Sequence, residues 1–252
     1  MTRIEIDGLP ATTETLAHPA VSTIGHFTAM QVRDHRVRGI DLHLTRLRTT
    51  SREMFDSDLD DDLVLSYIRH ALSDDIADAS LRVYVFQPQD ALSVMVTVNP
   101  PGEAPTTPQR LRTVPYTRPF PHLKHLGGFA QAHYTKLVRR DGYDDALLVT
   151  PDGLVTEGAT TNIGFFDGDT VVWPDAPILH GITMQLVSAA LAEPPRLAEV
   201  RLADLSSYDA AFLTNARGIV PVGSIDDLDF PVDPTRMKLL TDAYADVPWT
   251  RP

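Results

Sequence analysis

The chain has 252 residues, 43% of them hydrophobic, and a formal net charge of −12 at pH 7. A chain of this length buries a full core as one large or two small domains, and its acidity argues against nucleic acid or an anionic membrane as partner, because either needs a basic face. It contains no cysteine, which excludes disulfides, thiolate metal sites and a cysteine nucleophile.

The first hundred residues have the pattern of one α+β unit. Apolar alternation indicates strands, and apolar residues at helical spacing indicate amphipathic helices. The predicted elements are a strand near 24–32, a helix from about Asp41, a helix over 63–72, and strands at 81–86 and 92–98.

A domain boundary follows these elements. Residues 99 to 108 are dense in proline and glycine, which deny the backbone the conformations and donors of helices and strands. We therefore expect a small N-terminal α+β domain over residues 1–103 and a large C-terminal domain over residues 104–252.

The remaining residues alternate strands with a few helices. The expected strands lie near 111–114, 145–150, 154–157, 162–166, 170–173, 197–202, 210–214 and 219–225, and the expected helices are 129–141, one opening at Ile182 and one starting at Pro234. We find no internal repeat and no low-complexity tract.

The most informative segment is V-T-E-G-A-T-T-N-I-G-F-F at 155–166, which places Glu157 at the end of one predicted strand and Asn162 at the start of the next. A charged side chain at the end of a predicted strand is unusual unless it has a function. The position of the lysines in the chain suggests that this function is chemical. The chain has only three lysines, Lys124, Lys136 and Lys238, and Lys124 lies in P-H-L-K-H-L upstream of Glu157.

These segments belong to a co-linear set that resembles the class IV aminotransferases, which are pyridoxal phosphate enzymes. The set comprises H-L-T-R-L at 43–47, the Lys124 segment, G-Y-D-D-A-L-L-V at 142–149, V-T-E-G-A-T-T-N, I-L-H-G-I-T at 178–183 and T-N-A-R-G-I-V-P-V at 214–222. The chain is most similar to the branch that holds branched-chain aminotransferases, D-amino-acid aminotransferases and aminodeoxychorismate lyases.

The resemblance implies the fold, the cofactor and the reaction. The implied fold is the two-domain α+β fold type IV of pyridoxal phosphate enzymes, with the cofactor between the domains and a homodimer as the assembly. The implied reaction moves an amino group between an amino acid and a 2-oxo acid through a lysine Schiff base. An aminodeoxychorismate-type lyase using the same lysine is the main alternative, and a non-catalytic relative that binds the cofactor is the third.

Lys124 is the residue we expect to form the Schiff base. An ε-amine desolvated by apolar neighbours loses its proton more readily and becomes a nucleophile toward an aldehyde. The alternative for any lysine is a surface position over apolar neighbours. Lys136 is the rival, but it falls on the polar face of the predicted helix at 129–141, and Lys238 matches nothing in the family.

Glu157 is expected to lie against the pyridine nitrogen and keep it protonated, so that the ring accepts electrons from the substrate. An edge-strand glutamate in water is the alternative. Asn162 is expected to be structural, satisfying backbone groups beside the site.

The cofactor phosphate requires a cation and backbone donors. Arg46 matches the family's phosphate arginine, and a guanidinium makes charge-assisted bonds to phosphate oxygens. Ile182 and Thr183 open a helix whose free N–H groups favour an anion, although an ordinary N-cap explains Thr183 alone. Asn215 lies where relatives offer a further phosphate contact.

Departures from the family pattern bear on the substrate. Phe129 stands where branched-chain enzymes have a tyrosine, and Met184 stands where many relatives have arginine; both weaken any claim of branched-chain specificity. Arg217 could receive a substrate carboxylate or form a surface salt bridge. The segment 26–28, H-F-T, matches the pocket-lining strand of relatives, and F-T together with K-H-L is typical of the lyases.

Other chemistries lack their motifs. The sequence has no serine elbow, Walker loop, zinc-protease or dinucleotide motif, its histidines do not have metal-ligand spacing, and the acidic run at 56–62 lacks the glycine and glutamate of a calcium loop. We expect no metal. The N-terminus lacks the apolar stretch of a secretory signal, and nowhere do 18 apolar residues run together, so we expect a soluble, cytoplasmic protein.

Overall fold

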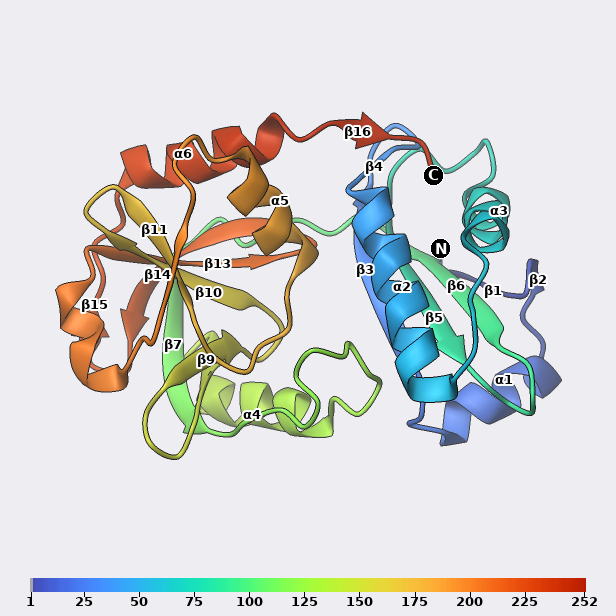
Figure 1. Ribbon diagram of the computed structural model, residues 1–252, viewed down its shortest axis with the longest axis horizontal. Coiled ribbons are helices and arrows are strands. Elements are labelled where there is room, and N and C mark those ends of the chain that lie inside the picture. Colours follow the sequence, from blue (N-terminus) through green and yellow to red (C-terminus); the bar gives the residue numbers. More distant parts are fainter. Residues whose placement is uncertain (1) are drawn as a thin grey trace. The chain divides into compact units, whose positions relative to one another are not determined.

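The computed structural model describes residues 2–252, and the chain divides into two compact units (Figure 1). Unit 1 extends to Gly102 and also contains Leu123–Gly127 and Pro248–Pro252. Unit 2 contains Glu103–His122 and Gly128–Val247. Two short segments beyond Gly102 therefore fold with the N-terminal residues.

Unit 1 is a five-stranded sheet with two long helices. Its elements are β1 (Arg3–Ile6), β2 (Leu9–Pro10), α1 (Thr13–Val21), β3 (His26–Val32), β4 (Val37–Arg38), α2 (Ile40–Phe55), α3 (Asp61–Leu72), β5 (Ala79–Phe86), β6 (Ser93–Asn99) and β16 (Trp249–Thr250). The strand order is β2-β1-β6-β5-β3, with antiparallel pairing throughout.

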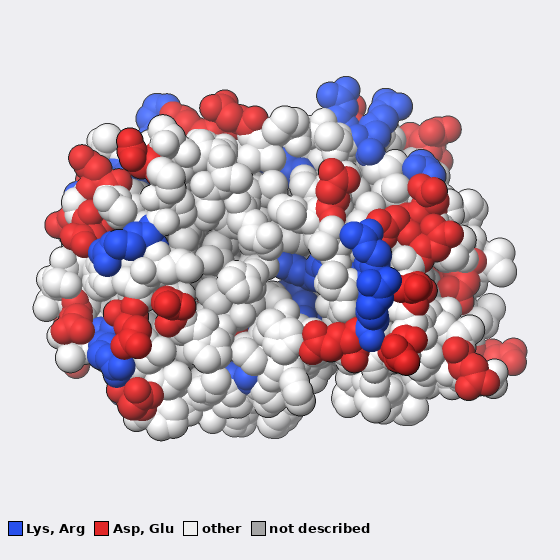
Figure 2. All heavy atoms as spheres, viewed as in Figure 1, with Lys and Arg blue, Asp and Glu red and all other residues white. Residues whose placement is uncertain are grey.

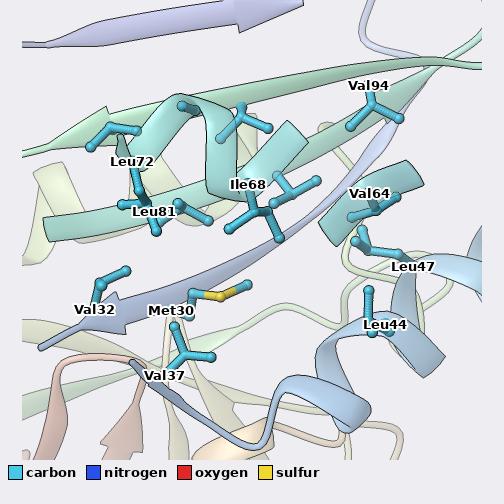
Figure 3. Packing of buried hydrophobic residues seen from close by; sticks show 14 of the residues in the cluster. Met30, Val32, Val37, Leu44, Leu47, Val64, Ile68, Leu72, Leu81 and Val94 are labelled. Atoms are coloured by element: carbon cyan, nitrogen blue, oxygen red, sulfur yellow. The ribbon is translucent and has the colours of Figure 1, made fainter. Parts of the chain in front are cut away.

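The core of unit 1 lies between this sheet and helices α2 and α3. Leu44 and Leu47 of α2 and Val64 and Ile68 of α3 point toward apolar strand residues such as Met30 (Figure 3). Their spacing of three or four residues puts them on one face of each helix, which is the pattern that predicted both helices.

Backbone pairing explains why residues 123–127 belong to unit 1. The Phe27 N–H donates to the carbonyl of Lys124 over 2.9 Å, and the Leu126 N–H donates to the carbonyl of Gly25 over 2.9 Å. His26 and His125 form an antiparallel bridge. The Lys124 segment thus adds a short strand to the edge of β3 that β5 does not occupy. At the C-terminus, β16 pairs with β4.

Unit 2 is built on a nine-stranded mixed sheet. Its elements are β7 (Gln109–Pro115), α4 (Phe129–Arg140), β8 (Asp145–Val149), β9 (Val155–Gly158), β10 (Asn162–Asp167), β11 (Thr170–Pro174), α5 (Ile182–Ala190), β12 (Arg196–Ala198), a 3₁₀ helix (Leu202–Ser207), β13 (Ala210–Asn215), β14 (Gly218–Ile225), β15 (Leu228–Asp229) and α6 (Pro234–Ala245). The strand order is β12-β11-β10-β13-β14-β7-β8-β9, and β15 pairs with β14.

Two of the three apolar clusters of unit 2 lie on either side of this sheet. One is formed by strand residues such as Leu147, Ile163 and Val222. The other packs Trp173 and Phe212 against residues of α5 and α6, including Val187 and Leu240. The helices α5 and α6 therefore cover one face of the sheet and fix where α5 begins.

The α+β fold predicted from the sequence is confirmed, but several elements differ. The segment 197–202 is not one strand: it comprises the end of β12 and the start of a 3₁₀ helix. Strand β1 and helix α1 were not predicted. Helix α1 buries none of its residues and has Pro19 inside it, so it lacks the apolar stripe that reveals an amphipathic helix.

The surface agrees with the composition. Asp and Glu side chains are spread over the face shown in Figure 2, whereas Lys and Arg form smaller groups. Within residues 2–252, none of the helices has the length and apolar character that crossing a membrane would require.

Candidate active site

In unit 2, short connections bring the predicted residues of the strand ends together. β9 ends at Gly158, and a tight turn, in which the Gly158 N–H donates to the Thr161 carbonyl over 2.9 Å, leads to Asn162 at the start of β10. Asn162 is in register with Thr214, the residue before the last residue of β13, Asn215. Glu157, Asn162 and Asn215 are therefore positioned by adjoining strand ends.

Glu157 is buried, with 4% of its surface exposed, and both carboxylate oxygens have partners. Oε1 accepts from Nη1 of Arg118 over 3.0 Å, and Oε2 accepts from the backbone N–H of Leu179 over 3.2 Å. Arg118 is buried to a similar degree. Removing two charges from water is costly unless they pair closely, so this ion pair shows that the strand end is built to hold an ionised carboxylate.

Arg118 was not predicted as a site residue. It lies in T-R-P-F-P, shortly before Lys124 in sequence, but its partner is 39 residues further on, and a single sequence does not reveal that contact. Its position in a proline-rich segment, where helix and strand donors are scarce, was the only available signal.

Asn162 holds the segment that leads into α5. Its Nδ2 donates to the carbonyl of Leu179 over 2.7 Å. Gly181 packs so closely that a Cβ at this position would collide with Oδ1 of Asn162. The glycine is therefore required by the close approach of the two segments, and the amide contact agrees with the structural role expected for Asn162.

The N-terminus of α5 has no side-chain cap. Gly181 is the N-cap residue, and it makes no side-chain bond to the first turn. The first N–H groups of a helix have no acceptors within the helix and carry a partial positive charge. Ile182 and Thr183 are both buried at this end, so their N–H groups form a small donor site suited to an anion.

Thr183 and Asn215 contact each other directly. The Thr183 hydroxyl donates to the carbonyl of Asn215 over 2.8 Å rather than capping α5, and Oδ1 of Asn215 accepts from the Arg217 N–H over 2.8 Å. The turn between β13 and β14 is thereby fixed to the start of α5. The neighbouring Thr214 hydroxyl is buried and has no hydrogen-bond partner within residues 2–252.

In unit 1, Lys124 lies beside the start of β3. Its backbone is held by β3, and its Nζ lies 4.9 Å from the centre of the Phe27 ring. An ammonium at this distance from an aromatic face is attracted by the ring. Phe27 itself stacks on Tyr84, so the ring that faces the amine is fixed from behind.

Arg46 belongs to the same region of unit 1. The pKa of His43, on α2, is lowered from 6.5 to about 3, first by burial and then by the positive charges of Arg46 and Lys124. Both cations must therefore lie close enough to His43 to act on it. Arg46 and Lys124, which were predicted from separate motifs, thus both lower the pKa of the same buried histidine.

The two other lysines have different surroundings. Lys136 is exposed on α4 and lines a shallow hollow with Thr135 and Arg139, on the polar face that its spacing predicted. Lys238 forms an exposed ion pair with Asp242 on α6.

Substrate-related positions also differ in exposure. Phe129 opens α4 with 79% of its surface exposed, whereas Met184 is buried in the core beneath α5. Arg217 is exposed at the turn between β13 and β14.

Solved structures show which class of protein has this fold. A hypothetical aminotransferase from Mycobacterium tuberculosis in its apo form matches with a TM-score of 0.85 and 20% identity, covering 98% of this chain and 99% of that one. A branched-chain aminotransferase from Thermoproteus uzoniensis matches at 0.79 and 22%, covering 96% and 93%. A putative 4-amino-4-deoxychorismate lyase from Legionella pneumophila matches at 0.79 and 21%, covering 89% and 91%. The fold is that of the class IV aminotransferases.

The sequence gives the family directly. Residues 25–225 match the family of class IV amino-transferases, and the chain belongs to this family. A probable branched-chain-amino-acid aminotransferase from Rickettsia felis is 33% identical over 92 residues, which are 35% of this chain. That match spans 31% of the length of the Rickettsia protein.

Proposed function

We propose that the protein is a pyridoxal-phosphate-dependent aminotransferase that exchanges an amino group between an amino acid and a 2-oxo acid. The observation that carries the proposal is the position of Lys124, a primary amine fixed by backbone pairing to β3 in the unit that also contains Arg46. Structures of the same fold from M. tuberculosis hold PLP in one case and alpha-ketoglutarate with PMP in another, which supports the choice of cofactor and substrate class.

The residues present fit pyridoxal phosphate. The cofactor needs an amine for its aldehyde, a carboxylate for its pyridine nitrogen and donors for its phosphate. Lys124 and Glu157 supply the first two, and Arg46, the uncapped start of α5 and Asn215 supply the third. The buried Thr214 hydroxyl, which has no partner within residues 2–252, is a further donor beside Asn215.

Lys124 has two tasks in this proposal. Its amine would hold the cofactor through the aldehyde carbon, with water as the leaving group, and the ε-amine, once displaced by the substrate amine, would move the proton between the substrate Cα and C4′ of the cofactor. When bound, pyridoxal phosphate supplies the electron sink that makes this proton acidic. The contact with Phe27 confines the amine while the proton moves.

Glu157 and Arg118 act as one unit. Glu157 keeps the pyridine nitrogen protonated, because a nearby negative charge favours the charged form of a base. Arg118 and the Leu179 N–H hold the carboxylate ionised and oriented, since both donate to it. Arg118 is thus a positioning residue.

The phosphate is assigned to Arg46, to the N–H groups of Ile182 and Thr183, and to Asn215. The bond from the Thr183 hydroxyl to the Asn215 carbonyl ties the last three into a rigid donor group, and rigid donors lose less entropy on binding. The assembly is proposed to be a homodimer, which sedimentation of the purified protein tests. Its location is proposed to be the cytoplasm.

A lyase of the aminodeoxychorismate type is the second candidate. Thr28 of the F-T pair is fully buried and bonded to His43, so this lyase-like feature is part of the interior of unit 1. The fold is also shared with the putative lyase from L. pneumophila.

A half-reaction separates the candidates. Protein loaded with pyridoxal phosphate is mixed with single amino donors while its absorbance spectrum is followed. Stoichiometric conversion to the pyridoxamine form is expected for an aminotransferase. Pyruvate release from aminodeoxychorismate without that conversion would identify the lyase, and loaded protein inert to both would point to the non-catalytic relative.

A further inference from the structure

The buried face of β3 changes from apolar to polar toward the end where the Lys124 segment pairs. His26 and Thr28 are both fully buried, while the next two inward residues are apolar. Each polar residue has a partner on α2: Oγ1 of Thr28 lies 2.6 Å from Nδ1 of His43, and Nε2 of His26 lies 3.0 Å from Oγ of Ser51. Two histidine–hydroxyl pairs therefore join the same strand to the same helix.

The two pairs differ in their electrostatic surroundings. Burial alone lowers the pKa of His26 to about 4. The pKa of His43 is lowered to about 3 by burial, then by Arg46, then by Lys124. Of the two histidines, only His43 has a pKa that Arg46 and Lys124 lower.

The Thr28–His43 bond also fixes a tautomer. A buried hydroxyl with an acceptor within reach is expected to donate to it, because an unsatisfied donor in the interior is costly. Within residues 2–252, Nδ1 of His43 is the only side-chain acceptor bonded to Oγ1 of Thr28. The hydroxyl therefore donates to Nδ1, and the neutral imidazole carries its proton on Nε2.

The pair is connected to both cations through the backbone. His43 lies one helical turn before Arg46 on α2, on the same side of the helix. Thr28 follows Phe27, whose N–H donates to the Lys124 carbonyl and whose ring faces Nζ. A bond between Thr28 and His43 therefore fixes the turn that carries Arg46 relative to the strand that carries Lys124.

We propose that Thr28 and His43 form a positioning pair that sets Arg46 and Lys124 at the separation required by a ligand with one phosphate and one aldehyde. The inference rests on the proposed function, because pyridoxal phosphate is that ligand. Neutral His43 adds no third positive charge to those of Arg46 and Lys124, whereas the Ser51–His26 pair joins β3 to α2 more than one helical turn after Arg46.

The test compares matched variants of the two pairs in the full chain. Thr28→Val removes the hydroxyl at constant shape, Thr28→Ser keeps it, and Ser51→Ala is the control that breaks the other pair. The dissociation constant of the apoprotein for pyridoxal phosphate and the thermal midpoint are measured for each. We expect Thr28→Val to weaken binding about tenfold, and Thr28→Ser and Ser51→Ala to change it less than about twofold.

A double-mutant cycle measures whether Thr28 and Arg46 act together in binding pyridoxal phosphate. A purely structural role of Thr28 would give no such coupling. Arg46→Met removes the phosphate cation, so the cost of Thr28→Val for binding should shrink to about twofold in the Arg46→Met background. Equal effects of Thr28→Val and Ser51→Ala on binding, or full additivity with Arg46→Met, would overturn the positioning role. Failure of the wild-type apoprotein to bind pyridoxal phosphate would instead overturn the proposed function, and the inference with it.

Discussion

The two units keep their buried polar groups in different ways. Between β3 and α2, unit 1 buries neutral pairs, His43 with Thr28 and His26 with Ser51. Unit 2 buries the charged pair Arg118–Glu157. The difference follows from what each unit must hold: beside Arg46 and Lys124, a further charge would repel or neutralise the cations, whereas a lone carboxylate in the interior needs an opposite charge to remain ionised.

Replacing the amine should have the largest effect. Lys124→Ala removes both the covalent link and the proton carrier, and we expect the rate of transamination to fall by about 10³-fold or more. Lys136→Ala is the matched control, because Lys136 is exposed on α4, and it should retain the wild-type rate. Steady-state kinetics of both variants checks this. Loss of activity in Lys136→Ala alone would reverse the assignment.

Replacing one partner of the Arg118–Glu157 ion pair in unit 2 should destabilise the protein strongly. Arg118→Met removes the guanidinium that donates to Oε1 of buried Glu157, and breaking a buried ion pair from one partner costs about 3–5 kcal/mol of unfolding free energy. Adding Glu157→Gln should restore part of that loss, since the remaining amide is neutral. Urea unfolding of the single and double variants measures the coupling. An Arg118→Met variant as stable as the wild type would show that the carboxylate does not need the pair.

The neutral pairs of unit 1 predict acid sensitivity. The pKa values of His26 and His43 in the folded protein, about 4 and about 3, lie below the ordinary 6.5. The unfolded chain therefore takes up protons first as the pH falls, and the contribution of each histidine to stability, complete above pH 6.5, is lost between 6.5 and about 4 for His26 and between 6.5 and about 3 for His43. Each histidine contributes a slope of about 1.4 kcal/mol per pH unit in that window.

A buried carboxyl group in unit 2 has the opposite effect on the free energy of unfolding as the pH falls. Burial raises the pKa of Asp145 above its ordinary 3.8, so this group favours the folded state at low pH and loses that contribution as the pH rises through the raised value. Urea unfolding between pH 7 and 4 measures the sum, and His26→Gln should flatten the slope by about one proton. Stability independent of pH over this range would contradict the neutral burial of both histidines.

The close contact before α5 predicts a smaller effect. A Cβ at Gly181 would collide with Asn162, so Gly181→Ala should cost about 1–3 kcal/mol. Gly128→Ala is the control, because a Cβ there meets only the Gln131 side chain at 3.8 Å. Thermal unfolding compares the two. A Gly181→Ala variant as stable as Gly128→Ala would show that the two segments are free to separate.

The sequence predicted those helices and strands whose apolar residues recur at regular spacing. Helix α2 shows its apolar spacing through Leu44 and Leu47, and the strands of both units show theirs. Helix α1 was missed because it buries none of its residues. Arg118 and the Thr28–His43 bond were missed for another reason: each depends on a contact between residues distant in the chain, and neither residue type nor spacing in one sequence reports such a contact.

The candidate residues were selected by motif, and the structure adds their surroundings. It brings Thr183 to Asn215, and it places Arg46 and Lys124 in unit 1, where both lower the pKa of His43. Glu157 was expected at a strand end, and its ion pair with Arg118 explains how a carboxylate remains buried there.

The most direct test of the account is to identify the residue that binds the cofactor covalently. Protein incubated with pyridoxal phosphate is reduced with borohydride, digested and mapped by mass spectrometry. The account predicts a single stable adduct on Lys124. An adduct on Lys136, or none on any lysine, would contradict it.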